Sequence, residues 1–146
     1  MDTTTSALPF PATAATAAAP QRRARWAGRL VSGLPVAFLI FDSVIKLVKI
    51  GPVTESMAEL GYPDHLTRGI GLLEICCLAI YLVPRWAALG ATLLTGYLGA
   101  AVATHLRVGS PMGSHTLFPI YVATMLWVGL WLRDARVRAL VKGGAR

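Results

Sequence analysis

Four stretches of mostly apolar residues divide the chain, at residues 30–50, 67–83, 86–106 and 117–132. Crossing the hydrocarbon of a bilayer takes about 20 helical residues, within a range of about 17 to 25. The first and third stretches reach this length, whereas the second and fourth are short and need their interfacial flanks to complete a crossing. Buried or re-entrant helices are the alternative for the short pair. The pattern therefore predicts an all-α fold, in which a polytopic membrane protein forms a bundle of four transmembrane helices.

Helix-breaking residues separate these stretches. Each connection contains glycine, proline or both, at Gly51, Pro52, Gly61, Pro63, Pro84, Gly109 and Pro111. Such residues mark turns, so they agree with the proposed boundaries. Pro35 lies inside the first stretch, where membrane helices tolerate a proline as a kink.

The cations predict an orientation. Four arginines precede the first stretch, five cations follow the fourth, and Arg85 lies in the turn between the middle two. The other two connections hold only Lys49, Arg68 and Arg107, and the first of them adds three acidic residues. Since cytoplasmic segments carry the excess of Lys and Arg, both termini are expected in the cytoplasm. The expected location is the cell (inner) membrane, which the chain crosses several times.

Composition supports the membrane and excludes several other classes of protein. The chain of 146 residues is 55% hydrophobic, with a mean hydropathy of +0.58, which is too apolar for an ordinary soluble domain. The net charge of +7 could suggest nucleic acid, but the cations flank apolar stretches, so no nucleic-acid partner is expected. Cys76 and Cys77 are adjacent in an apolar stretch, so neither a disulfide framework nor a metal site is indicated.

The ends of the chain are predicted to lie outside the bundle. Residues 1–20 are rich in Ala, Thr and Pro without hydrophobic periodicity, which is typical of a disordered tail. Residues 26–140 form the predicted four-helix membrane domain, and residues 141–146 form a basic C-terminal tail.

Ionisable residues at membrane depth are the candidates for a site. A charge at the bilayer centre costs about 2.5 to 3.5 kcal/mol on insertion scales, so such groups are usually paired or functional. At the helical rise per residue, the carboxylates of Asp42 and Glu74 lie at a similar depth, about 10 to 12 Å below the outer ends of their stretches. The candidate polar pocket consists of Asp42, Lys46, Glu74, His105 and Tyr97. A purely structural ion-pair cluster is an equal alternative, and haem ligation is disfavoured because His105 lacks a helical partner histidine.

Small residues recur every four positions in the third stretch. Ala88, Thr92, Gly96, Ala100 and Thr104 therefore lie along one ridge of a helix. Such a ridge lets membrane helices approach closely. Packing within the chain is the favoured interpretation, and a homo-oligomer interface is the alternative.

Several of these segments together resemble the DoxX-like family of small bacterial membrane proteins. The resemblance rests on residues 41–46 (FDSVIK), 60–63 (LGYP), 71–74 (GLLE) and 96–109 (GYLGAAVATHLRVG), and it extends over roughly residues 29–140. It implies a four-helix membrane bundle. For the wider family it also implies an association with quinone-linked oxidoreductases, such as the membrane part of thiosulfate:quinone oxidoreductase. The family offers no settled catalytic residues to carry over.

The sequence contains no recognisable catalytic motif. Three functions remain as hypotheses. In the first, a membrane subunit of an oxidoreductase system holds a quinone through Glu74 and His105, while a partner protein supplies electrons. In the second, an oligomeric small-molecule carrier uses the same charges as a relay. In the third, the polar groups specify packing in a structural or assembly protein. No cofactor other than a quinone is suggested.

Overall fold

The structure, a computed structural model, describes residues 13–143, and this part of the chain contains helices and no strand. Four long helices form the body of the molecule, and two short helices and one π-helical turn accompany them. The elements are α1 (Thr13–Val48), α2 (Gly51–Glu59), α3 (Leu66–Leu82), α4 (Ala87–Arg107), the π-helical turn Met112–Thr116, α5 (Phe118–Arg133) and α6 (Ala135–Gly143). The predicted all-α fold is confirmed for these residues.

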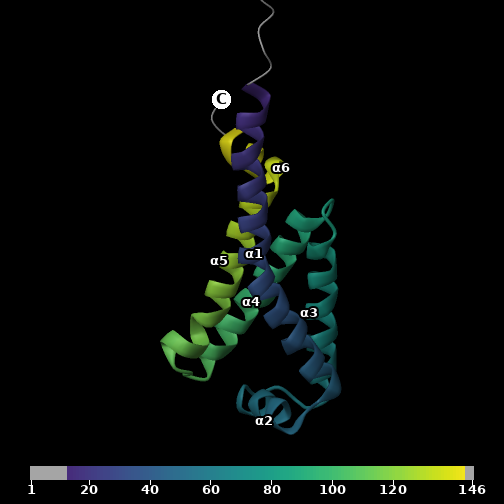
Figure 1. The fold of residues 1–146 in the computed structure, drawn as a ribbon. Helices are drawn as coiled ribbons and strands as arrows, with labels where there is room; N and C mark the ends of the chain where they lie inside the picture. Colours follow the sequence, from purple (N-terminus) through teal and green to yellow (C-terminus); the bar gives the residue numbers. More distant parts are fainter. Residues whose placement is uncertain (1–12, 144–146) are drawn as a thin grey trace, which may run out of the picture.

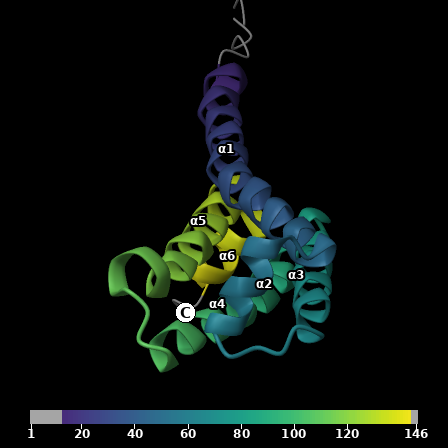
Figure 2. The same cartoon turned by 90° about the horizontal axis from the view of Figure 1, so that it is seen from below.

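The long helices close into a ring (Figure 1). α1 packs against α5 and α3, α3 packs against α4, and α4 packs against α5. The start of α1, the turn between α3 and α4, and α6 lie toward one end of the bundle, whereas α2 lies across the other (Figures 1 and 2). We call the first the basic end, because it carries Arg22, Arg23, Arg25, Arg29, Arg85, Arg133, Arg136 and Arg138. We call the second the α2 end.

Apolar side chains from all four long helices meet in the middle of the ring. Leu39 of α1, Leu78 of α3, Leu94 of α4 and Leu126 of α5 are each at most 1% exposed. Tyr81 is fully buried beside them and donates a hydrogen bond of 3.0 Å from its hydroxyl to the carbonyl oxygen of Leu126. A buried phenol needs such a partner, so this bond ties α3 to α5 across the core.

Two glycines bring α1 and α5 into backbone contact. A Cβ atom built on Gly28 would lie 2.7 Å from the carbonyl oxygen of Gly129, and one built on Gly129 would lie 2.7 Å from the Cβ of Ser32. Close approach through small residues is how membrane helices gain dispersion energy without a hydrophobic driving force. From this contact toward the α2 end the two helices diverge, as Figure 1 shows.

The chain turns sharply between α1 and α2. Lys49 adopts a left-handed backbone conformation with φ of 60°, which ends α1, and Pro52 lies in the first turn of α2. A proline is tolerated there because the first amides of a helix have no carbonyl partner within it. α2 buries Met57 toward the bundle and leaves Glu55 and Glu59 exposed, so it is amphipathic. The pattern of apolar stretches predicts only a connection here, between residues 50 and 67.

Three helices are long and apolar enough to cross a membrane. They are Arg22–Val48 within α1, Ala87–Arg107 and Met112–Arg133. α3 has 17 residues and falls just short of that group. Large apolar side chains remain exposed along the outside of the bundle, among them Leu34, Leu72, Leu93 and Val128. An apolar exterior of this kind belongs in lipid, so the molecule is a membrane protein.

The two predicted tails lie partly outside the described residues, which exclude 1–12 and 144–146. In the structure α1 begins at Thr13 and α6 continues to Gly143. Five of residues 13–20 are alanine, the strongest helix former, which suits the start of a helix there. The boundaries of the tails at residues 20 and 141 stay predictions.

The contact between Gly28 and Gly129 predicts a large difference between two glycine substitutions. We expect Gly129→Ala to destabilise the bundle by about 1 to 3 kcal/mol, because the new methyl group meets backbone atoms that cannot rotate away. The matched control is Gly96→Ala on α4, where nothing lies within 4 Å and alanine favours the helix. Thermal unfolding of the purified protein in detergent measures both. Equal melting temperatures for the two variants would contradict the contact.

Candidate functional site

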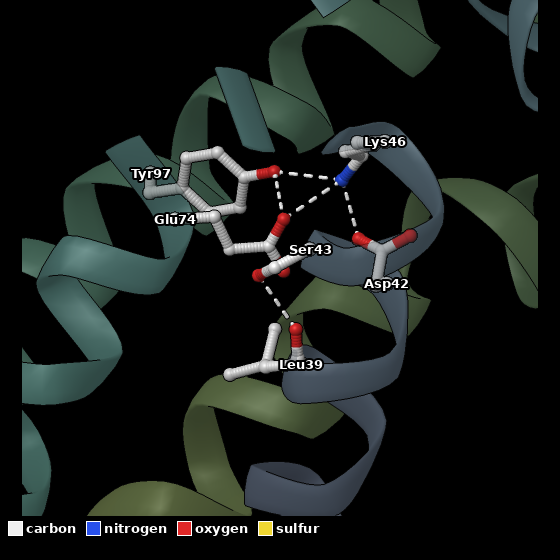
Figure 3. A network of polar contacts seen from close by, with 6 residues as sticks. All are labelled: Leu39, Asp42, Ser43, Lys46, Glu74 and Tyr97. Carbon is white, nitrogen blue, oxygen red and sulfur yellow. Dashed lines mark hydrogen bonds and ion pairs between the residues drawn. The ribbon is translucent and has the colours of Figure 1, made fainter. Parts of the chain in front are cut away.

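A lysine near the end of α1 joins three helices through its ammonium group. Lys46 Nζ donates hydrogen bonds to Asp42 Oδ2, to Glu74 Oε2 at 2.9 Å and to Tyr97 Oη at 2.9 Å. Tyr97 Oη in turn donates to Glu74 Oε2 at 2.8 Å. Figure 3 shows these four side chains pointing toward one another from α1, α3 and α4. An ammonium group has three protons, and all three are used here.

The close packing of α1 and α3 makes this cluster possible. A Cβ atom on Gly71 would lie 2.8 Å from the Cβ of Lys46 and 3.1 Å from the carbonyl oxygen of Ser43. Glu74 lies three residues after Gly71, on the same face of α3, so it is brought directly against Lys46. On α1, Asp42 precedes Lys46 by four residues and is its neighbour along the helix.

Glu74 lies behind the cluster and is completely buried. Its side chain is 0% exposed, compared with 12% for Lys46 and 26% for Asp42. One of its oxygens, Oε1, has no hydrogen-bond partner among the described residues. Glu74 therefore holds Lys46 and Tyr97 in place, and it is Asp42 that faces outward.

A mostly apolar cavity of about 520 Å³ opens beside the cluster. Asp42, Lys46 and Tyr97 form its polar wall, while Glu74 does not line it. Side chains from α1, α3, α4 and α5 form the apolar walls, among them Phe38, Ile70, Leu98 and Phe118. A cavity of this size and character is typical of sites for small molecules.

α2 and the segment after it cover the cavity at the α2 end. Val53 and Met57 of α2 and Leu60 line the cavity. Tyr62, which also lines it, shares a hydrogen bond of 2.9 Å between its hydroxyl and the Oγ1 of Thr104 on α4. The covering segment is thus fastened to the bundle on its far side.

His105 lines the same cavity but stands apart from the lysine cluster. Its Nδ1 atom shares a hydrogen bond of 3.0 Å with Ser110 Oγ. The ring of His115 lies at 5.9 Å between centroids, edge to face. The Nε2 atom of His105 has no hydrogen-bond partner among the described residues. The structure therefore brings together four of the five candidate residues, and His105 contributes to a different wall.

The middle of the small-residue ridge of α4 does not pack against the other helices. Packing within the chain was the favoured interpretation of this ridge. Thr92, Gly96 and Ala100 are exposed, and only the ends of the ridge, Ala88 and Thr104, are partly or fully buried. Another face of α4, formed by Ala87, Gly90, Ala91, Leu94 and Leu98, packs against the other helices. The ridge recurs every four residues, but the face of α4 that is buried in the bundle is the one that carries Leu94 and Leu98.

Sequence reasoning missed the residues of the covering segment. Met57 and Tyr62 belong to the connection between the first two apolar stretches, which was interpreted only through its turns, its acidic residues and the resemblance at residues 60–63. Val53, Met57 and Leu60 recur at a spacing of three to four residues between the acidic positions, which is the pattern of an amphipathic helix. That signal was present and would have predicted α2.

The arrangement can bind a ligand that is apolar over most of its surface and polar at one end. The second oxygen of Asp42, Oδ1, has no hydrogen-bond partner among the described residues, so it can accept a hydrogen bond from a donor group of a ligand. His105 Nε2 can donate or accept, depending on the tautomer. No group of three or more His, Cys, Asp or Glu suited to a metal ion occurs within residues 13–143.

The lysine cluster predicts that two neighbouring lysines differ sharply in their effect on stability. We expect Lys46→Met to lower the free energy of unfolding by about 3 to 5 kcal/mol, because it leaves buried Glu74 without its cation. Lys49→Met should cost about 0 to 1 kcal/mol, because its partner Asp64 is 69% exposed. Thermal unfolding in detergent compares the variants. Similar losses, or no recovery when Glu74→Gln is added to Lys46→Met, would contradict this assignment.

Comparison with known families identifies the family of the chain. A model described as the DoxX-like family matches residues 30–129, which include Asp42, Lys46, Glu74, Tyr97 and His105. Comparisons with curated proteins and with solved structures gave no significant match. The family match covers more than half of the chain and confirms the resemblance in its motifs. The chain therefore belongs to the DoxX-like family of membrane proteins.

Proposed function

We propose that this protein is a membrane subunit that binds a quinone in the cavity beside the lysine cluster and works with a partner oxidoreductase. The observation that carries the proposal is a mostly apolar cavity among the long helices, with a few hydrogen-bonding groups in its lining. A quinone matches this cavity, because its ring and tail are mostly apolar and its ring carries two polar oxygens.

Two side chains suit the two oxygens of the headgroup. Asp42 accepts a hydrogen bond from the hydroxyl of the reduced form through its free Oδ1. His105, which also lines the cavity, offers Nε2 to the other oxygen. Reduction of a quinone consumes two electrons and two protons. In this proposal the partner oxidoreductase supplies the electrons, and the protons reach the headgroup through these two side chains.

The lysine cluster also supports a purely structural role. All three protons of Lys46 are bonded within the protein, so the ammonium group has none to offer a ligand without breaking a contact. Under this alternative the cluster fixes the positions of α1, α3 and α4, and the cavity is filled by lipid chains. Ligand binding separates the two functions, because a structural cluster needs no occupant in the cavity.

We further propose that α3 is a fourth crossing and that the basic end faces the cytoplasm. α3 is about 25 Å long at a rise of 1.5 Å per residue, and it runs beside α1 and α4. The arginines of the basic end agree with the positive-inside rule. With four crossings both termini lie in the cytoplasm, and α2 lies at the outer surface of the inner membrane.

Quinone binding should depend on residues that line the cavity and not on matched residues elsewhere. We expect His105→Ala and Asp42→Asn to weaken equilibrium binding of a short-chain ubiquinol, the reduced form whose hydroxyl groups can donate to Asp42, by about three- to tenfold, the loss of one hydrogen bond each. His65→Ala is the control, since His65 is exposed at the start of α3 and does not line the cavity. No binding by the wild type, or equal binding by all four proteins, would overturn the proposal. Variants that changed only the melting temperature would favour the structural role.

The crossing number can be measured by labelling single cysteines. In a background with Cys76→Ala and Cys77→Ala, we introduce Glu55→Cys, Arg85→Cys or Ala135→Cys, all at exposed positions. We expect an impermeant maleimide to label intact cells only at position 55, and the other two positions only after permeabilisation. If α3 does not cross, positions 55 and 85 will be labelled from the same side.

A further inference from the structure

A second cavity lies at the basic end, far along the bundle from the lysine cluster. It has a volume of about 380 Å³ and is lined by residues from α1, α3, α4, α5 and α6. Four of the lining residues are arginines, namely Arg25, Arg29, Arg133 and Arg136. Arg25 and Arg29 are one helical turn apart on α1, and the other two flank the junction of α5 and α6. Segments distant in the sequence therefore converge on one concave site.

The positive charge of this cavity is not neutralised within the described part of the protein. The ion pairs among the described side chains all involve Lys46 or Lys49, at the other end of the bundle. Asp134 is the one acidic residue in the lining, but its Oδ1 accepts the backbone N–H of Arg136 and so caps α6. Four guanidinium groups therefore surround the cavity against one carboxylate.

Part of the cavity lining is apolar. Tyr81, Leu82 and Leu130 belong to it, and the guanidinium group of Arg133 lies 4.8 Å from the centre of the Tyr81 ring. This contact holds Arg133 in place by a cation–π interaction. A site lined by both basic and apolar side chains suits an amphiphile better than a free inorganic ion.

Exposed tryptophans place the cavity at the level of lipid headgroups. Trp26, Trp86 and Trp131 are 54%, 52% and 41% exposed, and each lies within a few residues of a cavity arginine or of Pro84 in its lining. Indole rings concentrate at the membrane interface, where lipid phosphates lie. The arginines of the cavity are thus at the depth of those phosphates.

We propose that this cavity binds the phosphodiester headgroup of an anionic phospholipid. The guanidinium groups provide forked donors that match two phosphate oxygens, and their charge selects an anionic lipid over a zwitterionic one. The acyl chains continue onto the apolar surface of the neighbouring helices. The site is independent of the quinone cavity, so either proposal stands without the other.

The test compares two double variants that remove the same charge from the same end. Arg25→Gln/Arg136→Gln removes two exposed cavity arginines, whereas Arg22→Gln/Arg23→Gln removes two exposed arginines outside the cavity. Native mass spectrometry of the full chain in detergent measures binding of phosphatidylglycerol and of phosphatidylcholine. We expect the first variant to lose about tenfold or more in affinity for phosphatidylglycerol and the second to lose less than about twofold.

Equal losses in the two variants would overturn the proposal, because they would indicate diffuse attraction by the whole basic end. Equal binding of the two lipids by the wild type, or displacement of phosphatidylglycerol by millimolar inorganic phosphate, would overturn it as well. Both double variants are expected to melt at the wild-type temperature without lipid. If the first does not, Arg25→Lys/Arg136→Lys keeps the charge, and a several-fold loss of affinity is still expected because the forked geometry is gone.

Discussion

A charged ammonium group inside a membrane bundle is stable only if protein groups replace all of its water. Lys46 meets this condition with partners from three helices, since Asp42 belongs to α1, Glu74 to α3 and Tyr97 to α4. The positions of these helices therefore depend on one another. α3 must approach α1 closely enough for Glu74 to reach Nζ, and Gly71 permits that approach because any side chain there would strike Lys46.

Two contacts at different heights give the bundle its shape. Near the basic end, Gly28 and Gly129 hold α1 and α5 together at backbone distance. Toward the α2 end the backbones of the same two helices separate, and Phe38 and Phe118 bridge them by edge-to-face packing with ring centroids 5.0 Å apart. Both rings also line the cavity. The cavity is therefore a consequence of how the helices cross, and α2 supplies the cover that this divergence requires.

The sequence predicted α3, α4 and α5 well because turn residues bound their apolar stretches, whereas α1 begins at Thr13 and not at residue 30. The expected stretches at 86–106 and 117–132 differ by one residue at each end from α4 and α5. The gathering of Asp42, Lys46 and Glu74 could also be anticipated, since helical rise places the two carboxylates at similar depth. The sequence did not reveal which carboxylate faces the cavity, because that depends on the rotation of α3 about its axis.

The inward face of α4 shows why periodicity alone is not sufficient. Ala88, Gly96 and Ala100 form a regular ridge, but Leu94 and Leu98 on another face fill the core, and both faces carry small residues that permit close packing. The amphipathic α2 was missed for a different reason. Its nine residues are too short to stand out beside membrane helices, and it is stabilised by tertiary contacts of Met57 and of the following Tyr62.

The order of burial within the lysine cluster has a consequence for selectivity. Glu74 and the protons of Lys46 are directed inward, so the part of the cluster that a ligand meets first is an unshared carboxylate oxygen of Asp42. An anionic molecule approaching through the cavity encounters like charge in a medium that screens it poorly. If both proposed sites bind as inferred, the polar wall of this cavity would disfavour carboxylates and phosphates while the arginines of the basic end would favour them, so the two ends of one small bundle would differ in the sign of charge that they accept.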